Sequence, residues 1–125
     1  MTWLAVAVGG ALGSIARHWV NLEIAHRWGR SVPYATATVN LVGAAVIGLL
    51  AGLIAAERLV LSPHVRTFVF VGILGGFTTF SSFVLDTFTL GHGGDHTGAA
   101  MNLMAQNTFG LLLAWAGYYV GIMRL

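Results

Sequence analysis

The sequence predicts an all-α integral membrane protein that crosses the bilayer with four helices. Of its 125 residues, 57% are hydrophobic and only 8% are charged, and the mean hydropathy is +0.81. Soluble globular domains carry about 25% charged residues, so this chain lacks the polar groups to cover its surface in water. Backbone groups inside a bilayer must hydrogen-bond within the protein, which favours helices. The composition therefore excludes a soluble enzyme and a disordered chain.

Charge, cysteine content and phosphate-binding motifs exclude further classes of protein. The net charge is only +2, which is too sparse for a nucleic-acid-binding surface. The chain contains no cysteine, which excludes a disulfide framework and a thiolate metal site. It also lacks the Gly-Lys-Ser/Thr motif of phosphate-binding loops, which argues against a pump driven by nucleotide hydrolysis.

Four apolar stretches are separated by the charged residues. They cover residues 3–22, 34–56, 67–90 and 99–123. The only charged residues inside them are Arg17 in the first and Asp86 in the third. Each stretch is long enough for a membrane-spanning helix, which needs about 20 residues. Because they use most of the chain and leave short connections, we expect one membrane domain over residues 1–125.

The arginines outside the four apolar stretches give little preference for one orientation in the membrane. With four crossings, one side carries Arg58, Arg66 and Arg124, and the other carries Arg27 and Arg30, plus Arg17 if it reaches the interface. Loop arginines set the orientation through the positive-inside rule, and here the two sides nearly balance. Such a chain can insert in both orientations, which would permit an antiparallel dimer of identical subunits. A single orientation set by the insertion machinery fits the weak bias equally well.

Glycine pairs spaced four residues apart indicate close helix packing. The pairs are Gly9/Gly13, Gly48/Gly52, Gly72/Gly76 and Gly117/Gly121. Small residues at this spacing let helix backbones approach closely in lipid. Four short helices enclose little interior of their own, so we also expect an oligomer.

Polar residues inside membrane spans are costly and are therefore functional candidates. In the second span, Thr36, Asn40 and Gly43 fall on one helical stripe. The amide of Asn40 can donate two hydrogen bonds, which would suit an anion that has lost its water. A hydrogen bond between helices explains the same residue equally well.

The third span contains the most unusual segment, residues 75–83, with two glycines, four hydroxyl residues and three phenylalanines. Glycine lowers helix stability, and Ser and Thr hydroxyls compete for backbone carbonyls. We therefore predict a break in this helix near Gly75–Thr78. Carbonyls freed at such a break can coordinate a small hard cation.

Phe80 and Phe83 follow this predicted break on one helix face. The edge of a phenyl ring is electropositive, so rings presented edge-on can stabilise a small anion. They do so without a full positive charge, which would hold the anion too tightly to let it pass. Aromatic packing between helices is the alternative and is the commoner use of this spacing.

Three segments together resemble the bacterial fluoride channel family (Fluc, also called CrcB). They are residues 9–17 (GGALGSIAR), 36–43 (TATVNLVG) and 75–83 (GGFTTFSSF). Length, span count and motif order agree over essentially the whole chain. The resemblance implies an antiparallel, dual-topology homodimer in the cell (inner or plasma) membrane. It also implies two pores for passive fluoride efflux, with a structural sodium ion at the dimer centre that is not transported.

The resemblance also implies roles for individual residues. The fluoride pore would be formed by Asn40, Phe80, Phe83, Thr36 and Ser81, the vestibule would hold Arg17, and the backbone carbonyls of Gly75 and Thr78 would bind sodium. The fourth span departs from the family, which often has serine or threonine there. Its stripe reads Asn102, Gln106, Gly110 and Ala114. We treat Asn102 and Gln106 as candidates for pore lining because their amides can still donate hydrogen bonds.

Two other classes of membrane protein fit part of this pattern. A small multidrug exporter is also a four-span dimer with weak orientation bias, but it needs a carboxylate deep in the first span. Here Arg17 lies deep in that span and Glu23 only at its end, which argues against an exporter. An accessory or structural membrane subunit would show no selective flux at all.

Overall fold

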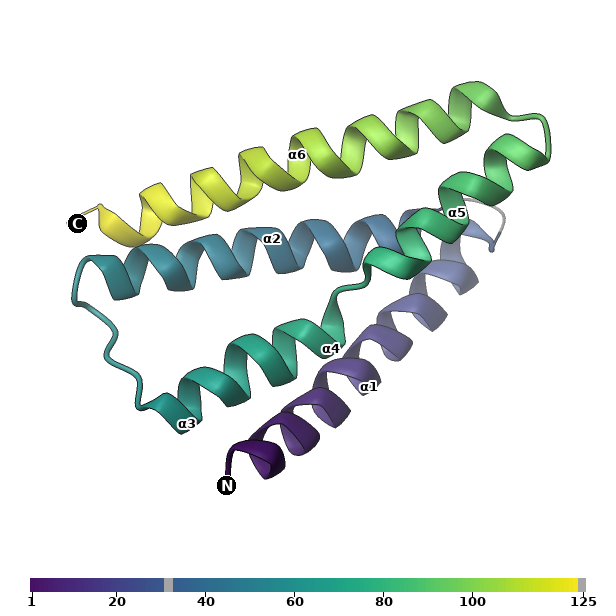
Figure 1. Cartoon of the computed structure of the whole chain (residues 1–125). Helices are drawn as coiled ribbons and strands as arrows, with labels where there is room; N and C mark the ends of the chain where they lie inside the picture. Colours follow the sequence, from purple (N-terminus) through teal and green to yellow (C-terminus); the bar gives the residue numbers. More distant parts are fainter. Residues whose placement is uncertain (31–32, 124–125) are drawn as a thin grey trace.

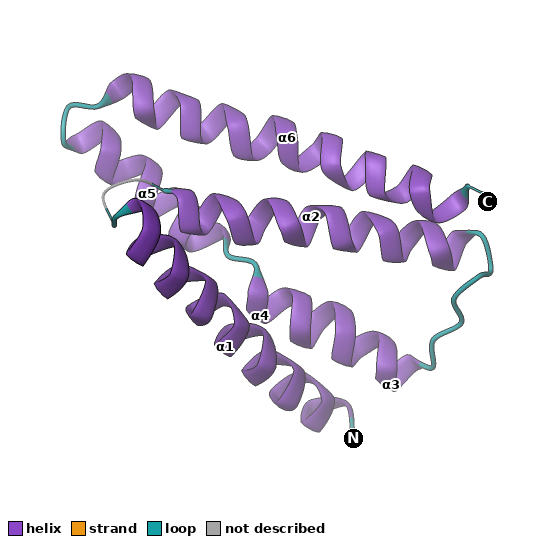
Figure 2. Cartoon of the chain, turned by 180° about the vertical axis from the view of Figure 1, so that it is seen from behind, coloured by secondary structure: helices purple, strands orange, loops and turns teal. Residues whose placement is uncertain are grey.

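The computed structural model describes residues 1–30 and 33–123, and all the regular structure in these residues is helical. The elements are α1 (Thr2–Trp28), α2 (Tyr34–Ala55), α3 (Pro63–Arg66), the π-helical segment η1 (Thr67–Leu74), α4 (Gly75–Phe77), α5 (Phe80–His92) and α6 (His96–Ile122). The elements α3, η1, α4 and α5 form the broken third helix, as Figures 1 and 2 show. The observed connections between helices are shorter than the predicted ones, because α1 continues to Trp28 and α6 begins at His96.

The helices are arranged as two neighbouring pairs. α2 packs along α6, and α1 packs along η1 and α4, while α5 crosses over to contact α6 (Figure 1). The N-terminus, the α2–α3 connection and the C-terminal end of α6 lie toward one end of the molecule. The end of α1, the start of α2 and the α5–α6 connection lie toward the other (Figures 1 and 2). This alternation is the arrangement that four consecutive crossings would produce.

The predicted glycine pairs lie at the two interfaces between these helices. Gly9 and Gly13 face η1 and α4, where a Cβ atom added to Gly9 would lie 2.9 Å from the Cα of Gly72. Gly48 and Gly52 face α6, and a Cβ on Gly121 would lie 2.7 Å from the carbonyl oxygen of Leu49. A side chain at these positions would overlap a neighbouring backbone. Close backbone contact therefore requires glycine there.

Two helical segments in residues 1–30 and 33–123 are long and apolar enough to cross a membrane by length and composition. They are Tyr34–Ala55, with a mean hydropathy of 2.1, and Pro63–His92, with a mean hydropathy of 1.9. α1 and α6 each have 27 residues, or about 40 Å at a rise of about 1.5 Å per residue. They are long enough to span but more polar, since α1 carries Arg17 and Glu23 and α6 carries three side-chain amides.

The buried and exposed residues are distributed in the opposite way to those of a soluble protein. In the described part of the chain, the buried apolar side chains are Val39, Leu74 and Phe83, and the buried polar ones are Thr36, Thr79, Asn102 and Gln106. Large apolar side chains such as Trp3, Phe88 and Leu111 are exposed instead. In soluble proteins, residues such as Leu and Phe are the ones most often inside. The outer surface of this chain is therefore suited to lipid.

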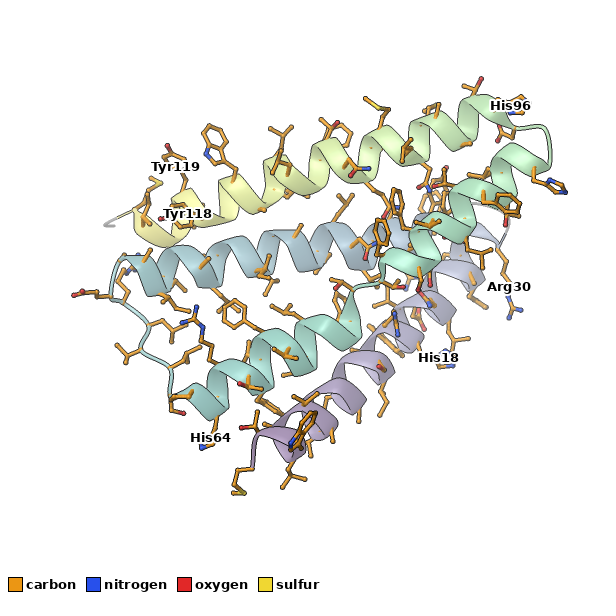
Figure 3. All side chains as sticks on the ribbon, viewed as in Figure 1. His18, Arg30, His64, His96, Tyr118 and Tyr119 are labelled. Carbon is orange, nitrogen blue, oxygen red and sulfur yellow. The ribbon has the colours of Figure 1, made fainter. Side chains whose placement is uncertain are left out.

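Aromatic side chains lie toward the ends of the long helices. Trp28 and Tyr34 form an edge-to-face pair with ring centroids 6.2 Å apart, where α1 ends and α2 begins. Trp115 forms another with Tyr119, at 4.9 Å, and Figure 3 shows Tyr118 and Tyr119 near the C-terminal end of α6. Trp and Tyr are enriched at the two membrane–water interfaces, so both ends of the bundle match that position.

Candidate functional site

The break in the third helix falls at Thr78 and Thr79. α4 ends at Phe77, and both threonines have extended backbone conformations, with φ/ψ of −85°/159° and −152°/114°. The break was predicted near Gly75–Thr78, but Gly75 is helical, with φ/ψ of −63°/−35°. Gly76 is also in the helix and packs against α1, where a Cβ would lie 2.6 Å from the carbonyl oxygen of Gly10. Gly76 thus serves helix packing, and the helical conformation ends after Phe77.

Asn40 on α2 bonds to the backbone at this break. Its Oδ1 accepts a hydrogen bond from the Thr79 N–H at 2.8 Å, and its Nδ2 donates to the Thr79 carbonyl at 3.0 Å. The side-chain amide therefore satisfies both backbone groups of a residue that is only 9% exposed. Without these bonds, two buried polar groups would lack partners, which costs about 1–3 kcal/mol each. The hydrogen bond between helices, which was the alternative explanation for Asn40 in the sequence, is thus present.

The hydroxyl groups after the break hold the start of α5. Thr79 Oγ1 accepts a hydrogen bond from the Ser82 N–H at 3.2 Å, as an N-cap residue does, and donates to Ser82 Oγ at 3.0 Å. Ser81 Oγ lies 3.4 Å from the same threonine hydroxyl, but the Ser81 residue is exposed. Three of the four hydroxyl side chains in this segment therefore serve local structure around the N-cap.

A chain of side-chain amides leads away from Asn40. The Asn40 Nδ2 also donates to Gln106 Oε1 at 2.8 Å, and Gln106 Nε2 donates to Asn102 Oδ1 at 2.8 Å. Asn102 Nδ2 then donates to Thr87 Oγ1, and Thr87 Oγ1 donates to the Phe83 carbonyl, both at 2.8 Å. Asn102 and Gln106 are 6% and 8% exposed. These bonds connect α2, α6 and α5 through polar side chains.

A cavity of about 250 Å³ lies beside the break, lined by Asn40, Thr78, Thr79, Phe80, Phe83, Gln106 and Asn107. None of these side chains is charged. The rings of Phe80 and Phe83 both border it, with centroids 5.8 Å apart and planes inclined by 53°. Phe83 is 6% exposed, whereas Phe80 is 76% exposed. One ring thus belongs to the interior of the subunit and the other to its surface.

The other predicted site residues lie outside this cavity. Thr36 is buried and lines a separate cavity of about 320 Å³ with Arg30 and Asp86. Asn102 lines a third cavity, of about 260 Å³, between α2 and α6, and Gln106 borders this one as well as the first. Of the predicted site residues, the cavity beside the break is therefore lined by Asn40, Thr78, Phe80, Phe83 and Gln106. Thr36 and Ser81 do not line it.

Arg17 and the two carbonyls predicted to bind a cation also lie at the break. Arg17 Nη1 donates to the Thr78 carbonyl at 3.4 Å, a long bond that leaves this oxygen weakly satisfied. In a continuous α-helix the Thr79 N–H would bond to the Gly75 carbonyl, but it donates to Asn40 instead. Gly75 is exposed. Within the described residues, the Gly75 carbonyl thus lacks its usual helical partner and the Thr78 carbonyl accepts only one long bond; carbonyl oxygens are the kind of ligand that hard cations prefer.

Three residues of the site were not singled out from the sequence. Thr79 provides both backbone groups that bond to Asn40, Thr87 ends the chain of amides, and Asn107 lines the cavity. Thr87 carried a usable signal, because it is a hydroxyl residue four positions after Phe83 in an apolar span. Thr79 carried none that separated it from Thr78, because the two threonines are adjacent.

Comparison with known proteins gives one consistent result. Residues 4–118 match the family model described as "CrcB-like protein, Camphor Resistance (CrcB)". The chain is 44% identical over 119 residues to the "Fluoride-specific ion channel FluC" of Rhodospirillum rubrum, covering 94% of this chain and 92% of that protein. The protein of the same name from Paramagnetospirillum magneticum is 41% identical over 119 residues, covering 94% and 93%. The one from Roseiflexus sp. is 38% identical over 125 residues, covering 100% and 98%.

Proposed function

The chain belongs to the CrcB family and is therefore an integral membrane protein and not an enzyme, and we propose that it is a fluoride-specific ion channel. In this proposal it lowers cytoplasmic fluoride by passive efflux through the cell (inner or plasma) membrane, which it crosses four times as a single membrane domain. The observation that carries the proposal is the similarity over nearly the whole chain to relatives named as fluoride-specific ion channels. This similarity favours a channel over a small multidrug exporter.

The chemistry of the cavity beside the break supports passage of a small, strongly hydrated anion. Its lining offers side-chain amide groups that can replace water, and phenyl rings whose electropositive edges can face an anion. A full positive charge in the same place would bind the ion too tightly for conduction. We propose that Asn40, Phe80 and Phe83 form this part of the pore. Thr36 would line it farther along, in the cavity of about 320 Å³, and Arg17 would attract anions at the vestibule.

We propose that the working channel is an antiparallel homodimer with two pores. Phe80 is 76% exposed although it borders the cavity, and Gly75 and Ser81 are also exposed. A second subunit placed against this face would cover the phenylalanine and bring Ser81 to a pore. The nearly balanced arginines of the two membrane sides allow such a partner to insert in the opposite orientation.

Flux measurements on the purified protein test the proposed function. We expect proteoliposomes loaded with fluoride to release it rapidly when the membrane potential is short-circuited, with negligible release of chloride from matched vesicles. Protein-free liposomes provide the baseline for both ions. Retention of fluoride at that baseline, with correctly inserted protein, would contradict the proposal.

We further propose that a structural sodium ion joins the two subunits through the carbonyls of Gly75 and Thr78. The fit rests on the Gly75 carbonyl freed by the break and on the long bond from Arg17 to the Thr78 carbonyl. Bound there, sodium would neutralise carbonyl dipoles that converge from the two subunits, and it would not be transported.

Replacing sodium with potassium tests this assignment. We expect the dimer to dissociate at lower detergent or denaturant concentration in potassium than in sodium of equal ionic strength. The reason is that the larger ion fits a site built for a smaller one less well. Chemical cross-linking followed by gel analysis measures the dimer fraction independently of flux. Equal dimer fractions in the two salts at every concentration would contradict the site.

A further inference from the structure

The side-chain amides of the site form one directional hydrogen-bonded chain between two backbone groups. At one end the Thr79 N–H donates to Asn40 Oδ1 at 2.8 Å, and at the other the Thr87 hydroxyl donates to the Phe83 carbonyl at 2.8 Å. The orientation of a carboxamide is usually inferred from its hydrogen bonds, and here the two backbone ends determine it. Asn40 must turn its oxygen to the Thr79 N–H, so its NH2 group faces Gln106.

The same reasoning orients the next two amides. Gln106 must present Oε1 to Asn40, so its NH2 group faces Asn102, and Asn102 in turn must direct its own NH2 group to Thr87. Turning any one of them by half a rotation would set donor against donor and acceptor against acceptor. Aligned bonds of this kind also polarise and strengthen one another. The chain therefore holds each amide in one orientation.

Counting the amide hydrogens, together with burial, shows which amide of the cavity lining can donate to an anion. Both hydrogens of Asn40 are used, one by the Thr79 carbonyl and one by Gln106. Gln106 uses one hydrogen, for Asn102, and its second has no acceptor in residues 1–30 and 33–123. Asn107 also uses only one of its hydrogens, but that residue is exposed, whereas Gln106 is 8% exposed. Gln106 also lines the same cavity as Phe83, and it borders the separate cavity of about 260 Å³ beside α6.

We propose that Gln106 supplies the amide hydrogen that contacts fluoride beside Phe83, and that Thr87 is a positioning residue that acts through Asn102. The assignment rests on the proposed channel function and deepens it. Asn40 then helps to orient Gln106 instead of donating to the ion itself. Thr87 is not among the residues that line either cavity, so it influences the ion only through the chain of amides.

Substitutions at Thr87 separate this role from simple packing. Valine has the shape of threonine but lacks the hydroxyl, so Thr87→Val leaves the Asn102 NH2 group without its acceptor and frees Gln106 to turn. Loss of one such bond is expected to lower the fluoride efflux rate about tenfold. It should also lower the ratio of fluoride to chloride efflux. The matched variant Thr87→Ser retains the hydroxyl and should stay within about twofold of the unmodified protein.

A double-variant comparison identifies Gln106 as the residue through which Thr87 acts. Methionine has a similar length but no donor, so Gln106→Met should lower fluoride efflux at least as much as Thr87→Val does. In the Gln106→Met protein, adding Thr87→Val should change efflux by less than about twofold, because coupled sites are not additive. Elution as a dimer after purification confirms that each variant is folded.

Three results would overturn the assignment. Normal efflux and selectivity in Thr87→Val would show that the hydroxyl is not needed. Equal loss in Thr87→Ser would assign the effect to packing, and multiplying effects in the double variant would show that Thr87 acts by another route. The same vesicles distinguish this inference from the function itself, because absence of fluoride efflux in the unmodified protein contradicts the channel.

Discussion

Replacing Phe83 with isoleucine is expected to abolish fluoride efflux from proteoliposomes while the protein remains folded. Phe83 is 6% exposed and lines the cavity beside the helix break. Isoleucine fills much of the same volume and costs little stability, but it has no electropositive ring edge to face the ion. We expect a loss of about 100-fold or more, which corresponds to roughly 2.7 kcal/mol of stabilisation for the permeating ion.

Phe88 on the same helix provides the matched control for this substitution. Its ring is 64% exposed and stacks on His92, with centroids 5.4 Å apart, away from the cavity. Phe88→Ile should therefore conduct fluoride at close to the normal rate. Efflux in Phe83→Ile that matches Phe88→Ile would show that the ring edge plays no part in conduction. Phe80→Ile tests the second ring and, in the proposed dimer, a position at the subunit interface.

Replacing Gly13 with alanine is expected to destabilise the fold, although the change adds only one methyl group. A Cβ at Gly13 overlaps the carbonyl of Ile73 and would lie 2.9 Å from the Phe77 nitrogen, so α1 and the third helix must move apart. Overpacking of this kind typically costs about 1–3 kcal/mol. This cost exceeds the gain of about 1 kcal/mol that alanine brings to a helix over glycine.

Gly10 lies one turn earlier on the same helix and allows a direct comparison. A Cβ there meets nothing within 4 Å, so Gly10→Ala should be neutral or stabilising through helix propensity alone. The temperature at which half of the detergent-purified protein still elutes as a dimer measures both variants. Equal temperatures for Gly13→Ala and Gly10→Ala would mean that close contact between α1 and the third helix does not contribute to stability.

Local sequence features predicted the helices and the contacts between their backbones. The lengths of the apolar stretches predicted the helical segments. The glycine spacing identified the surfaces where α1 meets the third helix and where α2 meets α6. The segment of residues 75–83 also predicted a break in the third helix, and Thr78 lay within the predicted interval. These features depend on residues within one or two helical turns, which is why the sequence is sufficient for them.

The partners of the polar side chains were decided only by the tertiary structure. Asn40 bonds to Thr79 and Gln106, which lie 39 and 66 positions away along the chain. The same packing places Phe83 inside and Phe80 outside, although the two lie three residues apart on one helix. In a helix that is apolar on most sides, the hydrophobic pattern does not specify which face turns inward. That rotation is set by the glycine contacts and the hydrogen bonds between helices, and it determines which polar groups can reach an ion.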